Sequence, residues 1–339
     1  MTLVGADRAT PVRAAASRPA PPRGRERATI AAWKAAESAI RHLPPDVALG
    51  LGARVGSAAL TLSPRRFRGL RANLEHVVPD ASERDLKRLL RRNVRNLARS
   101  WVEVLAMGSH GEELVSRVVP VNVENMLAPL ERGRGVVIAS LHLGSWETGI
   151  ACWNRRFGSM SLLAEVLRPQ ELFDHIIATR SALGVHVIPI DTAAMRESAD
   201  GAAARRLGAA ALRDVIRALR ANQLVAMAMD RDLIGNGVPL DFFGRPAPIP
   251  IGVVETAIRT GAAIVPIPLI RAGREVIAPC YPEVVYDASA PRDAEVRRVA
   301  AEVLRIFESI IRDHPDQWHV MDPIWSTPAT TDTVAEAAA

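Results

Sequence analysis

Hydrophobic positions follow two different patterns along the 339-residue chain. Residues 28–115 carry them at helical spacing throughout, and the clearest case runs from Ser82 to Ala106. The apolar stripe of this segment consists of Leu86, Leu89, Leu90, Leu97, Trp101 and Val104. Ser82, followed by Asp85 three residues later, resembles a capping box and marks the start of the helix. The pattern therefore predicts that residues 28–115 are helical.

From residue 116 onward, short apolar runs alternate with helical segments. The predicted strands cover residues 135–141, 160–163, 186–190, 224–229, 264–269 and 275–278. The predicted helices cover residues 147–156, 169–183, 209–221, 250–260 and 294–314. Residues 191–208 have no strong period and predict a surface loop or a frayed helix. This alternation predicts an α/β fold over residues 116–326, an αβα sandwich with a mostly parallel central sheet.

Both ends of the chain lack such patterns. Residues 1–27 are rich in Pro, Ala and Arg and predict a disordered basic tail without the apolar segment of a signal peptide. Residues 327–339 predict a second disordered tail. The most apolar long window, residues 47–62, contains Arg54 and is shorter than the roughly 20 residues that span a bilayer. It predicts a buried or interfacial helix and no transmembrane span.

Charge adds a preference for anionic partners. The chain has 43 basic and 37 acidic residues, a net charge of +6, and a pI of about 10.2. Basic residues are dense in the N-terminal helices: Arg65, Arg66, Arg68, Arg71, Lys87, Arg88, Arg91, Arg92, Arg95 and Arg99. They form either a solvated helix face or a patch for anionic membrane, where each contributes roughly 1 kcal/mol. The apolar helices beside them favour the membrane, so residues 28–115 are predicted to be a membrane-associating region.

Several familiar kinds of site lack support in the sequence. There is no P-loop, no G-x-G-x-x-G turn, no G-x-S-x-G nucleophile elbow, no CxxC pair and no HExxH helix. With only two cysteines, Cys152 and Cys280, the chain is not expected to have a disulfide framework, and a reducing compartment fits best.

The stretch HLGSWE, which follows the first predicted strand, contains two candidate residues. His142 falls in the loop after the strand, and a histidine there can act as a general base because its usual pKa lies near neutrality. Glu147 falls in the first turn of the next helix, where a carboxylate can also serve the helix by complementing its dipole. The stretch alone supports a helix start about as well as a catalytic site.

Asp230, Arg231 and Asp232 follow the apolar strand predicted at residues 224–229. Charges at the end of a buried strand are costly unless they are paired or functional. Asp230 can meet His142 from a neighbouring strand and orient its imidazole, or the three charges can form a structural ion pair at the sheet edge.

Other polar and aromatic residues are open to two interpretations. Glu165 and Arg180 are either surface charges or binding groups, since Arg180 can hold a phosphate or pair with a carboxylate. Phe242 and Phe243 either line an apolar slot or close the core.

Taken together, four blocks resemble the lysophospholipid and lipid A late-acyltransferase family, in the order in which that family carries them. HLGSWE matches its His-x4-Asp/Glu motif, and the other blocks are LLAEVLRPQELFDHIIATRSALGVHVIPI, MDRDLIGNGVPLDFFGRPAPIPIG and QWHVMDPIW. The resemblance covers roughly residues 30–326 and is greatest to the actinobacterial phosphatidylinositol mannoside acyltransferases.

This resemblance implies transfer of a fatty acyl chain from acyl-CoA or an acyl carrier protein to a hydroxyl of a glycolipid or phospholipid. The acceptor would be similar to phosphatidylinositol mannoside, on an anionic membrane. Neither a cofactor nor a metal is implied, and no nucleic acid. The expected state is a monomer bound peripherally to the cytoplasmic face of the cell membrane.

The resemblance also assigns roles to residues. His142 would be the general base and Asp230 its carboxylate partner, while Glu147 would belong to a charge relay or have an orienting role. Residues expected to bind substrate are Glu165, Arg180, Arg231, Asp232, Phe242 and Phe243.

Two alternatives of other classes stay open at this point. The first is an acyl-thioester hydrolase that uses His142 and Asp230 on water, which an added lipid acceptor would not affect. The second is a non-catalytic protein that binds anionic membrane, which would consume no thioester.

Overall fold

A computed structural model of the chain describes residues 24–197 and 201–325. The tail predicted at residues 327–339 lies outside these residues, as does most of the tail predicted at 1–27. Helix α1 (Gly24–Ile40) nevertheless begins inside the N-terminal stretch that was expected to be disordered.

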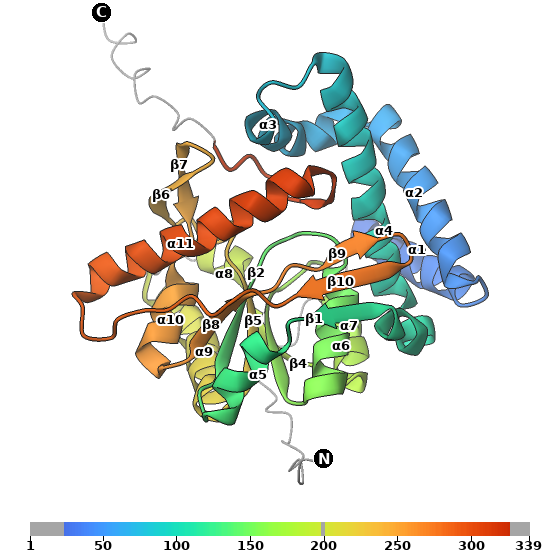
Figure 1. Cartoon of the computed structure of the whole chain (residues 1–339). Coiled ribbons are helices and arrows are strands. Elements are labelled where there is room, and N and C mark those ends of the chain that lie inside the picture. Colours follow the sequence, from blue (N-terminus) through green and yellow to red (C-terminus); the bar gives the residue numbers. More distant parts are fainter. Residues whose placement is uncertain (1–23, 198–200, 326–339) are drawn as a thin grey trace, which may run out of the picture.

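A five-stranded sheet forms the centre of the molecule (Figure 1). Its strands are β2 (Val136–Ser140), β3 (Met160–Glu165), β4 (His186–Ile190), β5 (Leu224–Ala228) and β8 (Ala263–Pro266). They lie in the order β4-β3-β5-β2-β8, and every neighbouring pair is parallel. The predicted mostly parallel central sheet is confirmed, with each of these strands near its predicted place.

Helices cover both faces of this sheet, because its strands are apolar on both sides. In β2, Val137 and Ala139 belong to one core cluster, whereas Val136 and Ile138 belong to the other. The first cluster is closed by α9 (Gly201–Arg220), α10 (Gly252–Thr260) and α11 (Arg292–Asp313). The second is closed by α4 (Glu83–Ser116), α5 (Glu124–Glu131) and α6 (Trp146–Phe157). This arrangement is the predicted αβα sandwich.

The N-terminal helices pack together on one side of the core (Figure 1). They are α1, α2 (Pro45–Leu62), the short 3-10 helix η1 (Pro64–Phe67), α3 (Arg68–Val77) and the long α4. Ser82 caps α4 by accepting from the Asp85 N–H at 3.2 Å, as the capping box predicted. Gly52 and Gly56 of α2 lie so close to α4 that a Cβ at either position would overlap α4. The absence of side chains at these two positions lets α2 and α4 approach closely.

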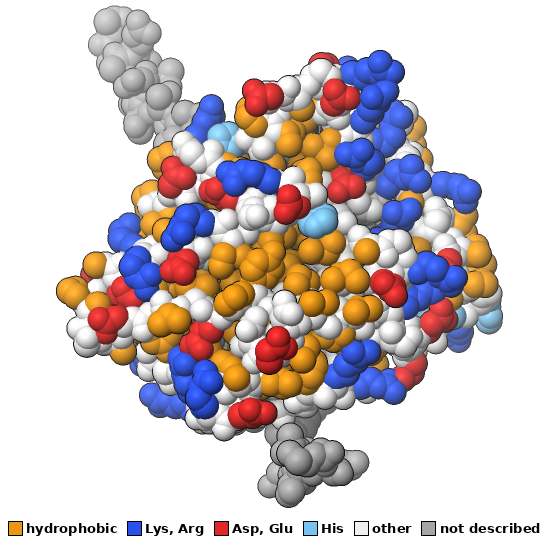
Figure 2. Space-filling view, viewed as in Figure 1, with side chains coloured by type: hydrophobic (Ala, Val, Ile, Leu, Met, Phe, Trp, Pro, Cys, Tyr) orange, Lys and Arg blue, Asp and Glu red, His pale blue; other side chains and the backbone are white. Residues whose placement is uncertain are grey.

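The surface of these helices carries both charge and apolar groups. Lys and Arg side chains gather over them at the upper right of Figure 2. On α2, Val47, Val55 and Leu62 remain exposed, with Leu62 at 82%. Among residues 24–197 and 201–325, no helix combines the length and apolar character needed to cross a membrane.

The structure contains several strands and helical segments that the sequence patterns did not predict. A three-stranded sheet contains β1 (Val118–Val121), β9 (Ile270–Ala272) and β10 (Glu275–Pro279), of which only β10 was predicted. Strands β6 (Val238–Phe242) and β7 (Arg245–Ile249) form a hairpin that the sequence patterns did not predict. The stretch 191–208 includes the short helix α8 (Thr192–Glu197) and the first turns of α9. Helix α7 (Gln170–Ala182) was predicted.

Candidate active site

His142 and Asp230 lie opposite each other at the carboxyl ends of two neighbouring strands. Strands β2 and β5 are parallel, and their register pairs Ser140 with Ala228. His142 and Asp230 each lie two residues beyond this pair, so the register itself brings them together. The carboxyl edge of a parallel sheet is the usual place for a ligand site in an open α/β fold.

The two residues are joined by two hydrogen bonds. His142 donates its backbone N–H to Asp230 Oδ2 at 2.8 Å, and His142 Nδ1 lies 2.8 Å from Asp230 Oδ1. The Asp230 side chain is fully buried, whereas His142 is 33% exposed. Burial alone would raise the pKa of Asp230, but the charge of His142 and the hydrogen bonds of His142 and Trp318 outweigh burial and hold this pKa below its usual value. Asp230 is therefore a carboxylate at neutral pH.

An ionised carboxylate only accepts hydrogen bonds, so His142 Nδ1 carries the proton that it donates to Asp230. In the neutral ring, the lone pair is then on Nε2. The arrangement can thus accept a proton at Nε2 and stabilise the resulting imidazolium through Asp230.

Glycine and serine in the HLGSWE loop hold His142 in place. Gly144 has a φ of 66°, and a Cβ there would overlap the backbone oxygen of Leu269. Ser145 donates its backbone N–H to Leu269 O at 2.9 Å and its hydroxyl to Glu103 at 2.6 Å. Glu103 in turn pairs with Arg271 at 2.6 Å. Only glycine fits the first position, which explains part of the motif.

A C-terminal segment completes the site, and the sequence reasoning gave its residues no role. Trp318 donates its indole N–H to Asp230 Oδ2 at 2.9 Å, a third hydrogen bond to this carboxylate. The backbone N–H of His319 donates to His142 O at 2.7 Å. The block QWHVMDPIW was the only signal for these contacts.

His319 itself is buried beside His142. Its Nδ1 lies 2.9 Å from the amide oxygen of Asn93, whose NH2 group donates to Pro315 O and Trp318 O. Burial, together with the charges of Arg271 and His142, lowers the pKa of His319 to about 3. Its ring is therefore neutral near pH 7 and adds no positive charge next to His142.

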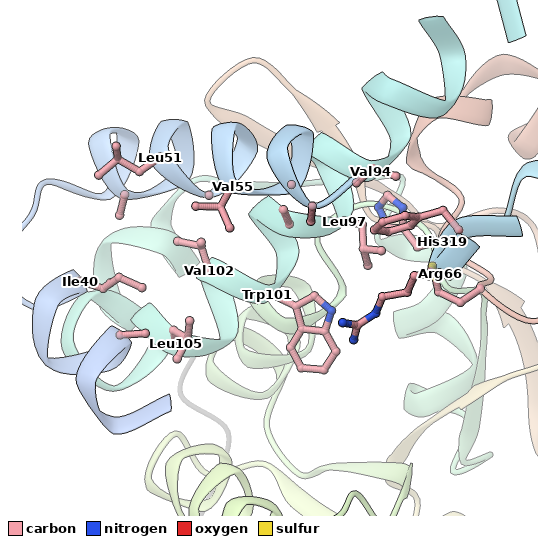
Figure 3. A pocket seen from close by; sticks show the side chains of 18 of the residues that line it. Ile40, Leu51, Val55, Arg66, Val94, Leu97, Trp101, Val102, Leu105 and His319 are labelled. Atoms are coloured by element: carbon pink, nitrogen blue, oxygen red, sulfur yellow. The ribbon is translucent and has the colours of Figure 1, made fainter. Parts of the chain in front are cut away.

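An apolar cavity of about 720 Å³ opens at His142 (Figure 3). It extends between α1, α2 and α4, with His319 and Arg66 at one end and Ile40 and Leu51 at the other. Its polar or charged lining residues are Arg66, His142, Arg231, His319 and Asp322, together with the indole of Trp146 and Trp101. This volume lies within the roughly 300–1,000 Å³ of small-molecule sites.

Comparison with known proteins places the chain in a family. The profile of the bacterial lipid A biosynthesis acyltransferases matches residues 25–327. The chain belongs to this acyltransferase family. It is also 29% identical to a phosphatidylinositol mannoside acyltransferase of Mycolicibacterium smegmatis, over 84% of this chain and 88% of that protein. A protein of the same name from Mycobacterium tuberculosis is 29% identical over 76% of each chain.

The chain is therefore an acyltransferase, and the family suspected from the four sequence blocks is confirmed. The non-catalytic alternative loses its support. Besides the His142–Asp230 dyad, the site residues that the sequence proposed for this acyltransferase fall into three groups.

Glu147 of the acyltransferase pairs with Arg180 rather than with the dyad. Arg180 donates from Nε at 2.9 Å and from Nη2 at 2.7 Å to the two oxygens of Glu147, a bidentate pair. The Glu147 side chain is 4% exposed and the Arg180 side chain is 13% exposed. Burial would lower the pKa of Arg180, but the charge and hydrogen bonds of Glu147 outweigh it and raise this pKa. These contacts favour an orienting or structural role for both residues; a part in the chemistry stays a prediction.

Substitution of this pair separates the two roles. Glu147→Leu leaves Arg180 buried without its partner and is expected to lower the free energy of unfolding by about 3–5 kcal/mol. In the double variant Glu147→Leu/Arg180→Met, most of this loss should be recovered, because no unpaired charge remains. If the pair is structural, the double variant keeps acyl transfer within about tenfold of wild type per folded molecule. A loss of about 10²-fold or more would show that at least one of the two residues takes part in the reaction.

Arg231 lines the cavity, and Glu165 lies next to Arg231. Arg231 donates to Asp322 at 2.8 Å, with Glu165 at 3.7 Å. Glu165 also accepts a hydrogen bond from the Thr192 hydroxyl. The structure thus places Arg231 in the same cavity lining as His142 and Glu165 beside Arg231, and their role in substrate binding stays a prediction.

Asp232, Phe242 and Phe243 lie apart from the cavity lining. Asp232 accepts the backbone N–H groups of Ile234, Gly235 and Gly237 at 3.1, 2.9 and 2.8 Å and thereby shapes its own loop. Both phenylalanines pack against the rings of Trp318 and Trp325. Their positions agree with the second sequence interpretation, in which they close the core behind the dyad.

No group of three or more His, Cys, Asp or Glu side chains in residues 24–197 and 201–325 is arranged to hold a metal ion. Cys152 and Cys280 are both buried and unbonded.

Proposed function

We propose that this acyltransferase moves a fatty acyl chain from a thioester donor to a hydroxyl of a glycolipid at a membrane surface. The donor is acyl-CoA or an acyl carrier protein, and the acceptor is similar to phosphatidylinositol mannoside. The observation that carries the proposal is the His142–Asp230 dyad at the end of an apolar cavity.

In this reaction, His142 Nε2 takes the proton of the acceptor hydroxyl while the oxygen attacks the thioester carbonyl carbon. A C–O bond forms, the C–S bond breaks, and the thiolate leaves with the proton returned by His142. Asp230 keeps the proton on Nδ1 before the reaction and stabilises the imidazolium during it. The acyl group passes directly to the acceptor, and no covalent acyl-enzyme is needed.

The apolar cavity is the proposed place of the acyl chain. Each methylene that leaves water contributes about 0.8 kcal/mol, and the α1, α2 and α4 lining is aliphatic over most of its length. A chain whose methyl end lies near Ile40 would hold its thioester at the other end of the cavity, where His142 lies.

Filling the far end of the cavity should shorten the accepted chain. Leu105 lines this end near Ile40 (Figure 3), so Leu105→Trp is expected to lower kcat/KM with a palmitoyl donor by about tenfold or more. Activity with an octanoyl donor should change by less than about threefold. The matched control is Leu212→Trp, at a partly exposed position of α9 away from the cavity. An equal loss with both donors would place the acyl chain elsewhere.

The acceptor is proposed from the two mycobacterial relatives, whose names specify phosphatidylinositol mannoside. Lipid mass spectrometry of a strain without the gene tests this assignment directly. We expect a glycolipid that lacks one acyl chain and regains it when the gene is restored. Unchanged glycolipids together with an under-acylated lipid of another class would contradict it.

The N-terminal helices are the proposed membrane-binding face, on the side that would contact the cytoplasmic leaflet. Exposed apolar residues of α2 lie beside the basic surface of α3 and α4, and anionic lipid attracts such a surface. The whole chain, as a monomer, would bind reversibly without spanning the bilayer.

Two exposed apolar residues outside the cavity lining allow a test of this face. Val47→Asp/Leu62→Asp is expected to reduce co-sedimentation with anionic phospholipid vesicles by about tenfold, because both side chains lose their apolar contact with lipid. The control Val285→Asp replaces a 69% exposed residue outside the N-terminal helices. Equal vesicle binding by both variants would contradict this membrane face.

A further inference from the structure

The backbone of Arg66 is held in place at the end of the cavity near His319. It belongs to η1, where its backbone N–H donates to Ser63 O at 3.0 Å. The next residue, Phe67, is 6% exposed and packs with Leu70 and Leu74 in the core between α3 and α4. Phe67 therefore anchors the turn from which the Arg66 side chain extends.

This turn is also attached to the segment that carries His319. The first turn of α3 lies so close to that segment that a Cβ on Gly69 would overlap Met321 O. Further along α3, the Asn73 amide donates to Val320 O at 2.9 Å and to Asp322 O at 2.8 Å. The position of Arg66 relative to the dyad is thus set by buried contacts rather than by a free loop.

The Arg66 side chain points into the cavity. Figure 3 shows it at the end near His319, with its guanidinium directed toward Trp101. Arg65, Arg66 and Arg68 are all exposed, but of these three only Arg66 lines the cavity.

Charge pairing distinguishes Arg66 from the other arginine of the lining. Arg231 is paired with Asp322 at 2.8 Å. Among the residues that the structure describes, no carboxylate lies within 4.0 Å of the Arg66 guanidinium. A cation that projects into an apolar cavity beside a catalytic base, without an acidic partner, is suited to an anionic group of the ligand.

We propose that Arg66 binds a phosphate group of one of the two substrates at the mouth of the cavity. The inference rests on the proposed function, in which both the thioester donor and a phospholipid-based acceptor carry phosphate. The planar guanidinium can donate two parallel N–H bonds to phosphate oxygens, a geometry that lysine does not offer. Arg66 would then fix the depth at which the substrate sits relative to His142.

Arg66→Gln tests this inference with purified full-length protein, palmitoyl-CoA and phosphatidylinositol mannoside in mixed micelles. The expected result is a rise of about tenfold in KM for the phosphate-bearing substrate, with kcat within about twofold of wild type. Arg66→Lys should recover only part of the loss. The controls Arg65→Gln and Arg68→Gln remove the same charge from the same basic surface. Any general loss of membrane attraction is therefore common to all three variants, and the tenfold rise should be specific to Arg66→Gln.

A donor without phosphate identifies the source of the bound group. With palmitoyl-pantetheine, the defect of Arg66→Gln should disappear if Arg66 binds the CoA phosphates. It should persist in the KM of the acceptor if Arg66 binds the lipid phosphodiester. If Arg66→Gln matches Arg65→Gln for every substrate while wild type transfers the acyl chain, the inference is wrong and the proposed function stands. If wild type transfers no acyl chain to the lipid, the proposed function fails and this inference fails with it.

Discussion

His142→Ala is expected to lower kcat/KM for acyl transfer by about 10³-fold, within the 10²–10⁴-fold range of a general base. The variant removes the ring nitrogen that takes the proton of the acceptor hydroxyl in the proposed reaction. Asp230 would keep the hydrogen bonds from the backbone N–H of residue 142 and from Trp318, so the fold should survive. The measurement is acyl transfer from radiolabelled acyl-CoA, with the thermal unfolding midpoint recorded in parallel.

A second histidine variant tests whether the loss of activity is specific to His142. His42→Ala replaces an exposed histidine in the turn after α1 and should leave both turnover and unfolding unchanged. Unchanged turnover in His142→Ala would remove His142 from the mechanism, whatever the control does.

Asp230→Asn is expected to lower kcat by about 10³–10⁴-fold while keeping nearly the same side-chain volume. Both carboxylate oxygens accept from N–H donors: Oδ1 from His142 Nδ1, and Oδ2 from the His142 backbone and Trp318. An asparagine must direct its NH2 at one of these sides. If the NH2 group faces His142 Nδ1, it favours the tautomer that is protonated at Nε2, and this tautomer cannot take the acceptor proton. If the NH2 group faces the other side, it lies against the N–H groups of the His142 backbone and Trp318.

Nitrogen NMR of the labelled imidazole gives the physical readout for this variant. We expect wild-type His142 to be protonated at Nδ1 and the variant to shift toward protonation at Nε2. Asp214→Asn, at a partly exposed position of α9, is the control for the same chemical change. Wild-type kcat in Asp230→Asn would show that the carboxylate does not support the base.

The sequence predicted the central sheet well, because its strands are continuous apolar runs between clear helical segments. It also put His142 and Asp230 each just after a strand. What it did not contain was the strand order, and the dyad depends on β2 and β5 being neighbours with Ser140 opposite Ala228. The strand order is a property of the tertiary structure, whereas the periodicity of the sequence indicates only the secondary structure of each segment.

The missed elements have identifiable reasons. The hairpin has no recognisable strand pattern because its two strands contain Pro239, Pro246 and Pro248. Proline is nevertheless tolerated in such edge strands. The turn between the strands has Phe243 and Gly244 at positive φ. Strands β1 and β9 have only four and three residues, too few for a pattern.

Side-chain contacts between residues far apart in the sequence could not be predicted either. Glu147 meets Arg180 from 33 positions away, and Trp318 meets Asp230 from 88. At such separations the sequence shows a charge or an indole but not its partner. Glu147 was thus read together with His142, its near neighbour in sequence, whereas the structure pairs it with α7.

The most direct test of the central claim is the release of CoA from palmitoyl-CoA by wild-type protein, measured with and without phosphatidylinositol mannoside, with the lipid products identified by mass spectrometry. Acyl transfer by the His142–Asp230 dyad predicts that CoA release depends on the acceptor and that the palmitoyl group appears as a new ester on the glycolipid. CoA release at the same rate without acceptor, with free palmitate as the only product, would contradict it and identify a thioester hydrolase.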